Sequence, residues 1–570
     1  MAGFIIIINL AFFAHICYDD ITNHKSRRIA IFHTSNFIRV KSGSFLRVKR
    51  INGKEQNLFS TVVSAAINGI ESKKVMVEAD VSDGMPVFSM VGFLASEVKE
   101  AQDRVRTALK NSDIHLPAKR ITVNLSPADL KKAGSGFDLP IAIAVLASLG
   151  YIPQESLKGI LFAGELSLNG EINGIRGVME IVSGAAGFGC HTCVIPQSNL
   201  REGSVIRGVR VLGAKSIKQV LYFLTGEGTL AETSINIEEI RSRQEEKTGV
   251  DFSEVQGQAL LRRAAEVAVS GLHNLLIIGP PGSGKTMTAR RIPTILPQTT
   301  LEEALEISKL HSIAGILPEE VGLRTVRPFR SPHHTITPIA LAGGGSCPKP
   351  GEVSLAHRGV LYLDELPEFE KNTLEILRQP LEEGKISISR NTGSYLFPAD
   401  FMLVASMNPC KCGYYPDRNR CSCSVREVKR YLNHISQPLL DRIDICVEAK
   451  PILYEELKSF HGGENSSQIR ERVTQAQKIQ QFRYQGTKYR FNSDLSAAGI
   501  KKYCTLGKEE EELMREAFEK LNLTARSYNR ILKVARTIAD LEGEEYISTT
   551  HLGEAVCYRA LDKKYWMERM

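Results

Sequence analysis

The sequence lacks the features that mark membrane-spanning, disulfide-rich and strongly charged proteins. Its 570 residues carry 72 basic against 64 acidic side chains, and a net charge of +8 allows a nucleic-acid partner without requiring one. The apolar run at residues 4–17 is shorter than the ~20 residues of a membrane span. Eleven cysteines in a chain of this length do not form a disulfide framework. We therefore expect two or three globular domains and no membrane partner.

Residues 1–58 differ in character from the rest of the chain. No Lys or Arg precedes the apolar run and no small-residue cleavage site follows it, which argues against a signal peptide. We expect a non-native or disordered extension, in which residues 1–57 come from an upstream start and Leu58 marks a non-AUG initiation codon. A membrane-tethering extension is the alternative.

A glycine-rich segment at residues 279–286 follows the apolar run 275–278. This order predicts a buried strand, a phosphate-binding loop and a helix, with backbone N–H groups around a polyphosphate. Lys285 would reach the β- and γ-phosphates of ATP, and the Thr286 hydroxyl would hold Mg²⁺. The candidate nucleotide-binding residues are Gly279, Pro280, Pro281, Gly282, Ser283, Gly284, Lys285 and Thr286.

Two further strands supply candidate catalytic residues. Nucleotide hydrolysis needs an acidic site on an adjacent strand, and Asp364 and Glu365 follow the apolar run 360–363. Asp364 suits the Mg²⁺ shell, and Glu365 suits polarising the attacking water. A third strand over residues 401–405 ends near Asn408, which we expect between the two earlier sites, at the γ-phosphate.

Two arginines extend the candidate site. Arg442 could project toward the γ-phosphate of a neighbouring subunit, as an arginine finger in trans. Arg526 opens a helical stretch and could reach back to the same nucleotide. For both residues a surface salt bridge is the alternative.

These motifs, in this order, resemble those of AAA+ ATPases of the magnesium-chelatase and MCM branch. Residues 59–565 are similar to the ComM/YifB family of magnesium-chelatase-like proteins, whose further motifs match at residues 327–335, 343–346, 350–357, 408–413 and 535–541. The resemblance implies a cytoplasmic, homo-hexameric motor that uses ATP for helicase or branch-migration activity on single-stranded or branched DNA, in recombination or natural transformation.

Two other functions stay open. One is a magnesium-chelatase-like ATPase subunit that remodels a protein partner. The long N-terminal domain and the lack of a D-x-S-x-S motif argue against it, so no porphyrin is expected. The other is an ATP-dependent protease of Lon type, which would need a Ser–Lys dyad. In the matching segments the nucleophile's position falls on Gly136 and the lysine's on Arg176, which stays protonated, and Ser135 is displaced by one residue.

The resemblance also implies the fold class. We expect an N-terminal Lon-protease-like α/β domain (ribosomal S5 domain 2-like) without catalytic dyad at residues 59–225 and a linker at 226–252. An AAA+ α/β core at 253–460 and a C-terminal helical lid at 461–570 would follow. Within the first domain, periodicity predicts strands at 75–81 and 121–125 and helices at 97–111 and 139–149; in the lid it predicts helices at 509–521, 527–541 and 549–560.

Two parts of the predicted core carry further chemistry. Cys410, Cys412, Cys421 and Cys423 could surround one structural Zn²⁺ tetrahedrally, or remain four reduced thiols in a loop. The segment 386–397 reads as a hairpin with Arg390 at its middle, which we expect to contact DNA from the pore of a hexamer. His333 and His334 have no acidic or Cys partner at ligand spacing, which favours a structural or subunit-contact role.

Overall fold

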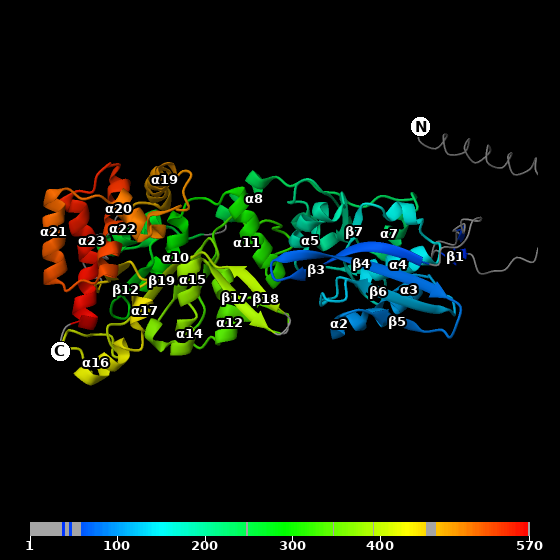
Figure 1. Ribbon diagram of the computed structural model, residues 1–570, viewed down its shortest axis with the longest axis horizontal. Helices are drawn as coiled ribbons and strands as arrows, with labels where there is room; N and C mark the ends of the chain where they lie inside the picture. Colours follow the sequence, from blue (N-terminus) through cyan, green and yellow to red (C-terminus); the bar gives the residue numbers. More distant parts are fainter. Residues whose placement is uncertain are drawn as a thin grey trace, which may run out of the picture. The chain divides into compact units, whose positions relative to one another are not determined.

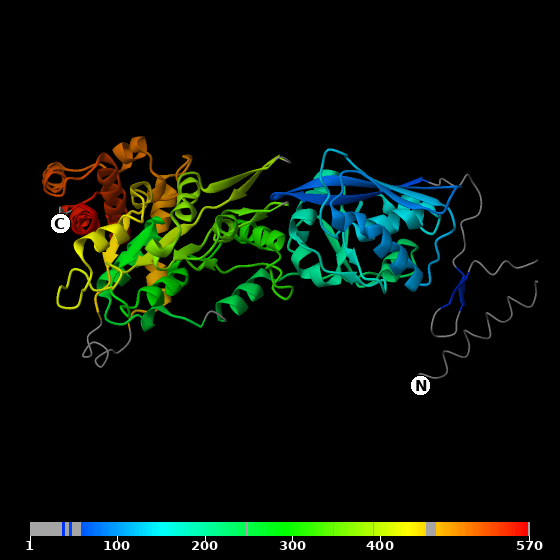
Figure 2. The ribbon, with the colours of Figure 1, turned by 90° about the horizontal axis from the view of Figure 1, so that it is seen from below.

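The computed structural model describes residues 37–39, 45–47, 59–246, 249–345, 347–390, 393–451 and 463–567 (Figures 1 and 2). The chain divides into two compact units, Met1–Gln56 and Asn57–Met570. In the first unit the described residues form one antiparallel pair, β1 (Phe37–Arg39) and β2 (Phe45–Arg47). The rest of the extension expected at residues 1–58 lies outside the described residues. No helix in the described ranges combines the length and apolarity needed to cross a membrane.

The second unit begins with an α/β domain around a seven-stranded sheet of order β11-β10-β7-β3-β4-β6-β5. Val75, Val77 and Val81 are buried at alternate positions of β4, as the period of two predicts. The strands of this sheet are β3 (Phe59–Asn68), β4 (Glu71–Ser82), β5 (Phe88–Val91), β6 (Arg120–Ser126), β7 (Ile160–Phe162), β10 (Thr192–Pro196) and β11 (Arg210–Ala214).

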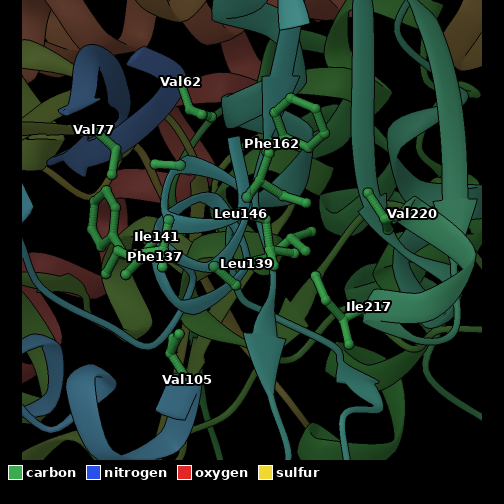
Figure 3. Packing of buried hydrophobic residues seen from close by; sticks show 14 of the residues in the cluster. Val62, Val77, Val105, Phe137, Leu139, Ile141, Leu146, Phe162, Ile217 and Val220 are labelled. Atoms are coloured by element: carbon green, nitrogen blue, oxygen red, sulfur yellow. The ribbon is translucent and has the colours of Figure 1, made fainter. Parts of the chain in front are cut away.

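Helix α4 (Asp138–Ser148) is buried along its whole length because it is apolar on all sides. Figure 3 shows its residues Leu139, Ile141 and Leu146 in the core of this domain, with Ile217 of α7 nearby. The helix predicted at 139–149 is confirmed, whereas the one predicted at 97–111 is divided at Glu100 into two helices. The helices of this domain are α2 (Ser96–Lys99), α3 (Ala101–Asn111), α4, α5 (Val178–Ala185), α6 (Leu200–Gly203) and α7 (Ile217–Leu224), with a two-stranded sheet of β8 (Glu165–Leu166) and β9 (Ile172–Asn173).

The core predicted at residues 253–460 is built on a five-stranded, wholly parallel sheet of order β13-β16-β19-β12-β20. Its strands are β12 (Leu275–Ile278), β13 (Phe329–Arg330), β16 (Val360–Leu363), β19 (Met402–Met407) and β20 (Ile445–Glu448). The strand of Asp364 was expected beside β12, which is wrong: β19 lies between β12 and β16. Asn408, directly after β19, therefore stands between the two earlier sites, as predicted.

Helices and two hairpins surround this sheet. The hairpin predicted at 386–397 is confirmed as β17 (Lys385–Arg390) and β18 (Gly393–Pro398), and a shorter one joins β14 (Gly343–Gly344) to β15 (Lys349–Pro350). The helices are α9 (Ala259–Gly271), α10 (Lys285–Ile295), α11 (Leu301–Ala314), α12 (Pro338–Ala342), α13 (Glu352–Leu355), α14 (Lys371–Glu375), α15 (Arg378–Glu383), α16 (Val425–Leu432) and α17 (Gln437–Leu440).

The chain ends in a helical region, coloured orange to red in Figures 1 and 2. The three predicted helices are confirmed, and two more precede them. Their bounds are α19 (Ser466–Arg483), α20 (Ala497–Tyr503), α21 (Lys508–Lys520), α22 (Ala525–Glu542) and α23 (Thr549–Asp562). Residues 226–252 were expected to be a linker of little apolar periodicity, yet they include helix α8 (Ile237–Glu246), whose residues Ile237 and Ile240 pack against a small buried cluster.

Candidate nucleotide site

The phosphate loop lies between the fully buried strand β12 and helix α10. Gly282 and Gly284 have φ values of +77° and +79°, in the left-handed region that glycine adopts without strain. A Cβ built at either position meets no atom within 4 Å, so the loop faces open space there. At Gly279, in contrast, a Cβ would lie 2.6 Å from the Ala449 carbonyl oxygen. The loop is therefore packed at its start and open where a phosphate would bind.

Lys285 is buried at the start of α10, and its ammonium group is hydrogen-bonded to uncharged oxygens. Its Nζ donates to the Gly279 carbonyl at 2.7 Å, the Pro280 carbonyl at 2.8 Å and Asn408 Oδ1 at 3.1 Å. Burial lowers its pKa, and the charges of Asp364 and Glu365 act in the opposite direction. In the described part of the chain no carboxylate pairs directly with Lys285, so the loop keeps one cation available to an anionic ligand.

Thr286 and Asp364 form the candidate Mg²⁺ site. Thr286 Oγ1 donates to Asp364 Oδ2 at 2.8 Å, close to the ~3 Å between neighbouring ligands of an octahedral Mg²⁺ with bonds of about 2.1 Å. The other carboxylate oxygen, Oδ1, accepts from the Ser406 hydroxyl and from the Glu365 N–H, the latter at 3.0 Å. The two oxygens thus fit a hard cation, and one of them is oriented by its own hydrogen bonds.

Tyr362 and Ser406 form hydrogen bonds beneath the two candidate Mg²⁺ ligands, within the strands. The sequence analysis did not predict this role for them. The Tyr362 hydroxyl donates to Thr286 Oγ1 at 3.3 Å and lies 2.9 Å from Ser406 Oγ. Each residue stands two positions before a predicted site residue, Asp364 or Asn408, and so on the same face of its strand. The available signal was a polar side chain in an otherwise apolar, buried strand.

Glu365 stands at the mouth of the site with a strained backbone. Its φ of +53° is left-handed, which is uncommon for a non-glycine residue, and its side chain is 54% exposed. His334, beyond the end of β13, places Nδ1 at 3.7 Å from Glu365 Oε2 and packs edge-on against Phe369. The histidine expected to have a structural or subunit-contact role therefore lies beside the candidate water-polarising carboxylate.

Arg442 and Arg526 lie at the opposite edge of the sheet. Arg442 precedes β20, and its carbonyl accepts from the side chain of Asn274, which precedes β12. Since parallel strands share one direction, this is the amino edge, whereas the phosphate loop follows the carboxyl edge. Arg442 forms an ion pair with Glu382.

Arg526 does not extend to the phosphate loop of its own chain in this conformation. Its Nη1 lies 2.7 Å from Asp441 Oδ2, next to Arg442, and its role at a nucleotide stays a prediction. Burial and the charges of Arg378 and Arg526 lower the pKa of Arg442. Arg378, paired with Glu375 at 2.7 Å, is thus a third arginine of this edge, and no sequence motif marked it.

The four cysteines of residues 410–423 gather at one point. Their sulfur atoms lie within 4.8 Å of one another, and those of Cys410, Cys412 and Cys421 are separated by 3.3, 3.5 and 3.7 Å. Sulfur ligands of a tetrahedral zinc site with Zn–S bonds of about 2.3 Å lie about 3.8 Å apart. The cluster therefore has the spacing of a four-thiolate metal site.

The remaining candidate residues lie away from the nucleotide site. Arg390 is exposed at the end of β17, and its Nη2 lies 3.0 Å from a Cβ built at Gly344 of the neighbouring hairpin. In the N-terminal domain, the Ser135 hydroxyl donates to Glu165, whereas the Arg176 side chain lies against Gly315 after α11. The described contacts thus engage Ser135 and Arg176 with different partners.

A phosphate loop, an acidic pair and a polar residue between them, on a parallel sheet followed by helices, define an AAA+ protein of P-loop type. Family models described as magnesium chelatase, subunit ChlI, as subunit ChlI of Mg-chelatase and as its C-terminal part match residues 251–457, 77–199 and 463–559. The chain is 42% identical to the competence protein ComM of Haemophilus influenzae over 504 residues, which cover 88% of this chain and 97% of the relative.

The protein YifB of Escherichia coli is 41% identical over 506 residues, with the same coverage. A magnesium-chelatase 67 kDa subunit of Chlorobaculum parvum is 28% identical over 206 residues, 36% of this chain and 26% of that one. The chain belongs to the ComM/YifB family of magnesium-chelatase-like AAA+ proteins, and this membership implies an ATPase that uses ATP and Mg²⁺.

Proposed function

We propose that the protein is a hexameric, ATP-driven DNA motor, a helicase or branch-migration factor that acts in the cytoplasm in recombination or natural transformation. The observation that carries the proposal is the division of the nucleotide site between two edges of one sheet. The phosphate loop follows the carboxyl edge, whereas Arg442 and Arg526 stand at the amino edge. Two such halves make one site where the amino edge of one copy meets the carboxyl edge of the next.

The carboxyl edge fits ATP and Mg²⁺. The open loop at Gly282 and Gly284 would bind the phosphates through backbone N–H groups, and Lys285 would move from its carbonyl acceptors onto phosphate oxygen. Thr286 and Asp364 would hold Mg²⁺, which when bound neutralises charge on the phosphates. Asn408, already bonded to Lys285, would orient the terminal phosphoryl group and the water.

Glu365 would accept a proton from the attacking water through its exposed carboxylate. His334 would fix the direction of that carboxylate when it donates from Nδ1 to Oε2. Arg442 and Arg526 of the neighbouring subunit would stabilise the charge that develops on the transferred group. In that arrangement each would leave its present carboxylate partner, Glu382 or Asp441, for the phosphate.

DNA is the proposed partner because the core exposes a hairpin that ends in Arg390 and a family relative is named for competence. Arg390→Ala should weaken binding to forked DNA severalfold at low salt and lower DNA-stimulated ATP hydrolysis, while basal hydrolysis stays unchanged. Arg515→Ala on the exposed face of α21 is the matched control. If neither forked nor four-way DNA stimulates hydrolysis or binds at low salt, the DNA assignment fails, and remodelling of a protein partner, favoured by the ChlI family models, takes its place.

The cysteine cluster is proposed to hold one structural Zn²⁺. Its four soft ligands and their sulfur separations support zinc rather than Mg²⁺ or Ca²⁺. Because all four positions would be filled by protein, the ion would have a structural role. Elemental analysis of the purified chain should give about one equivalent of zinc, and an amount under about half an equivalent would count against the site.

A further inference from the structure

The cysteine cluster begins one residue after the candidate γ-phosphate sensor. Strand β19 ends at Met407, whose carbonyl accepts from the Gly279 N–H at 3.1 Å. Asn408 follows with its side chain bonded to Lys285, and only Pro409 separates it from Cys410. Any displacement of Cys410 is therefore transmitted to Asn408 through a single, conformationally restricted residue.

The loop that contains the four cysteines also packs against the phosphate loop. Gly413 has a φ of +90°, and a Cβ built on it would lie 2.6 Å from Pro281 Cδ. Its N–H donates to the Cys410 carbonyl at 3.0 Å, which closes a turn around Cys412. The turn that carries the first two cysteines thus packs directly against the loop that would bind ATP.

The second pair of cysteines leads into helix α16, which packs against the same cluster. Cys423 is followed by Ser424, which caps α16 through a reciprocal bond with Glu427. Tyr431 of α16 packs against the buried apolar cluster that contains Cys410. Asn408 is therefore held on its side chain by Lys285 and along the chain by Cys410, whose surroundings include α16.

We propose that the metal bound by the four cysteines holds Asn408 and the Pro281 side of the phosphate loop in place, so that zinc occupancy sets the affinity for nucleotide. The inference rests on the proposed ATPase and zinc site. Without the ion, the turn of Cys410 and Cys412 is joined covalently to the segment of Cys421 and Cys423 only through the intervening polypeptide, and this loop gains conformational freedom. The nucleotide must then order this loop as it binds.

The test measures zinc and nucleotide binding separately on the full chain. Zinc is removed with a chelator, the chelator is dialysed away, and the binding of a fluorescent ATP analogue is titrated at constant excess Mg²⁺. We expect a loss of about ten- to a hundredfold in affinity, the range seen when supports around a metal site are removed. The affinity should return when zinc is added back, but not when more Mg²⁺ is added.

Two variants distinguish the effect of losing the metal from the effect of disturbing the contact between Gly413 and Pro281. The double variant Cys421→Ser with Cys423→Ser should lose zinc and affinity together, whereas Cys557→Ser, at an exposed cysteine, should lose neither. Gly413→Ala keeps all four ligands but forces a methyl group onto Pro281, so it should keep zinc and still lose affinity. Thermal unfolding curves verify that each variant is folded.

The outcomes distinguish the inference from its premises. Unchanged nucleotide affinity in the zinc-free chain, or in a folded Gly413→Ala variant, would overturn the coupling and leave the ATPase assignment intact. A chain that already lacks zinc when it is purified, and still binds nucleotide tightly, would remove both the zinc site and the coupling. Normal binding by Lys285→Ala would instead contradict the proposed nucleotide site itself.

Discussion

The two edges of the ATPase sheet are built on opposite principles. At the carboxyl edge, Lys285, Thr286, Asp364 and Asn408 are bonded to one another or to the loop, and one cation lies ready for an anion. At the amino edge, Arg378, Arg442 and Arg526 each form an ion pair with a carboxylate of their own chain, as Arg442 does with Glu382. The first edge is organised before it binds a ligand, whereas the second must exchange an ion pair in order to act.

This difference indicates where binding and turnover are controlled. Burying Arg442 beside Arg378 and Arg526 is unfavourable, because like charges repel and burial removes water from the guanidinium. A multiply charged anion that binds beside the three arginines would attract each of them and so offset their mutual repulsion. We infer that the carboxyl edge determines whether nucleotide binds, and that the amino edge of a neighbour determines whether it is hydrolysed.

Lys285→Ala breaks the carboxyl edge and should have the largest effect on nucleotide binding. Nucleotide affinity should fall roughly a hundredfold, since a charge-assisted hydrogen bond contributes about 3 kcal/mol. Equilibrium titration with a fluorescent ATP analogue measures the loss. Arg290→Ala, an exposed cation on the same helix, is the control and should bind normally; equal affinities for the two variants would refute the role of Lys285.

Glu365→Gln separates binding from turnover within the carboxyl edge. Affinity should be retained while the rate of hydrolysis falls about 10²- to 10⁴-fold, because the amide cannot accept the proton of water. Phosphate release under saturating ATP gives the rate, and Glu368→Gln, three residues away and exposed, should turn over normally. A Glu365→Gln variant with ordinary turnover would show that another residue polarises the water.

Tyr362→Phe tests the support beneath the Mg²⁺ site. The change deletes the hydroxyl that contacts Thr286 and Ser406, so the ligands should be less firmly oriented. The Mg²⁺ concentration needed for half-maximal hydrolysis should rise about tenfold. The rate at saturating Mg²⁺ should change much less, and an unchanged Mg²⁺ requirement would indicate that Asp364 needs no such support.

His334→Ala should give the smallest of these effects. The imidazole contacts Glu365 only at its rim, at 3.7 Å, and both side chains are partly exposed. Hydrolysis should slow severalfold without a change in nucleotide affinity, and His334→Gln should restore part of the rate because its amide can donate to the carboxylate. The neighbouring His333→Ala is the control and should leave the rate unchanged.

Local pattern was sufficient to predict the elements that carry the site. The apolar runs before Gly279 and Asp364 coincide with β12 and β16, because a short buried strand is apolar throughout and ends at a polar turn. The hairpin of Arg390 and the helices of the lid were found by the same means. Asn408 was expected between the two earlier sites from the order of the motifs, and β19 places it there.

What the sequence did not predict depends on pairing between distant segments. The insertion of β19 between β12 and β16 is a property of the sheet, and no residue of β19 encodes its neighbours. Arg378 joins Arg442 only because α15 folds against the segment before β20, some sixty residues later in the chain. The position of Arg526 beside Asp441 was not predicted either, because sequence order cannot tell which edge of the sheet a distant helix faces.

The central claim is most directly tested by mixing two inactive variants. Lys285→Ala should bind ATP roughly a hundredfold more weakly and stay empty at an ATP concentration that just saturates the wild type, whereas Arg442→Ala should bind ATP normally without hydrolysis. In an equimolar mixture, about one quarter of the interfaces would pair an intact loop with an intact arginine, so hydrolysis should recover to about that fraction of the wild-type rate. A mixture as inactive as its two components would contradict the account, because Arg442 would then serve only its own subunit.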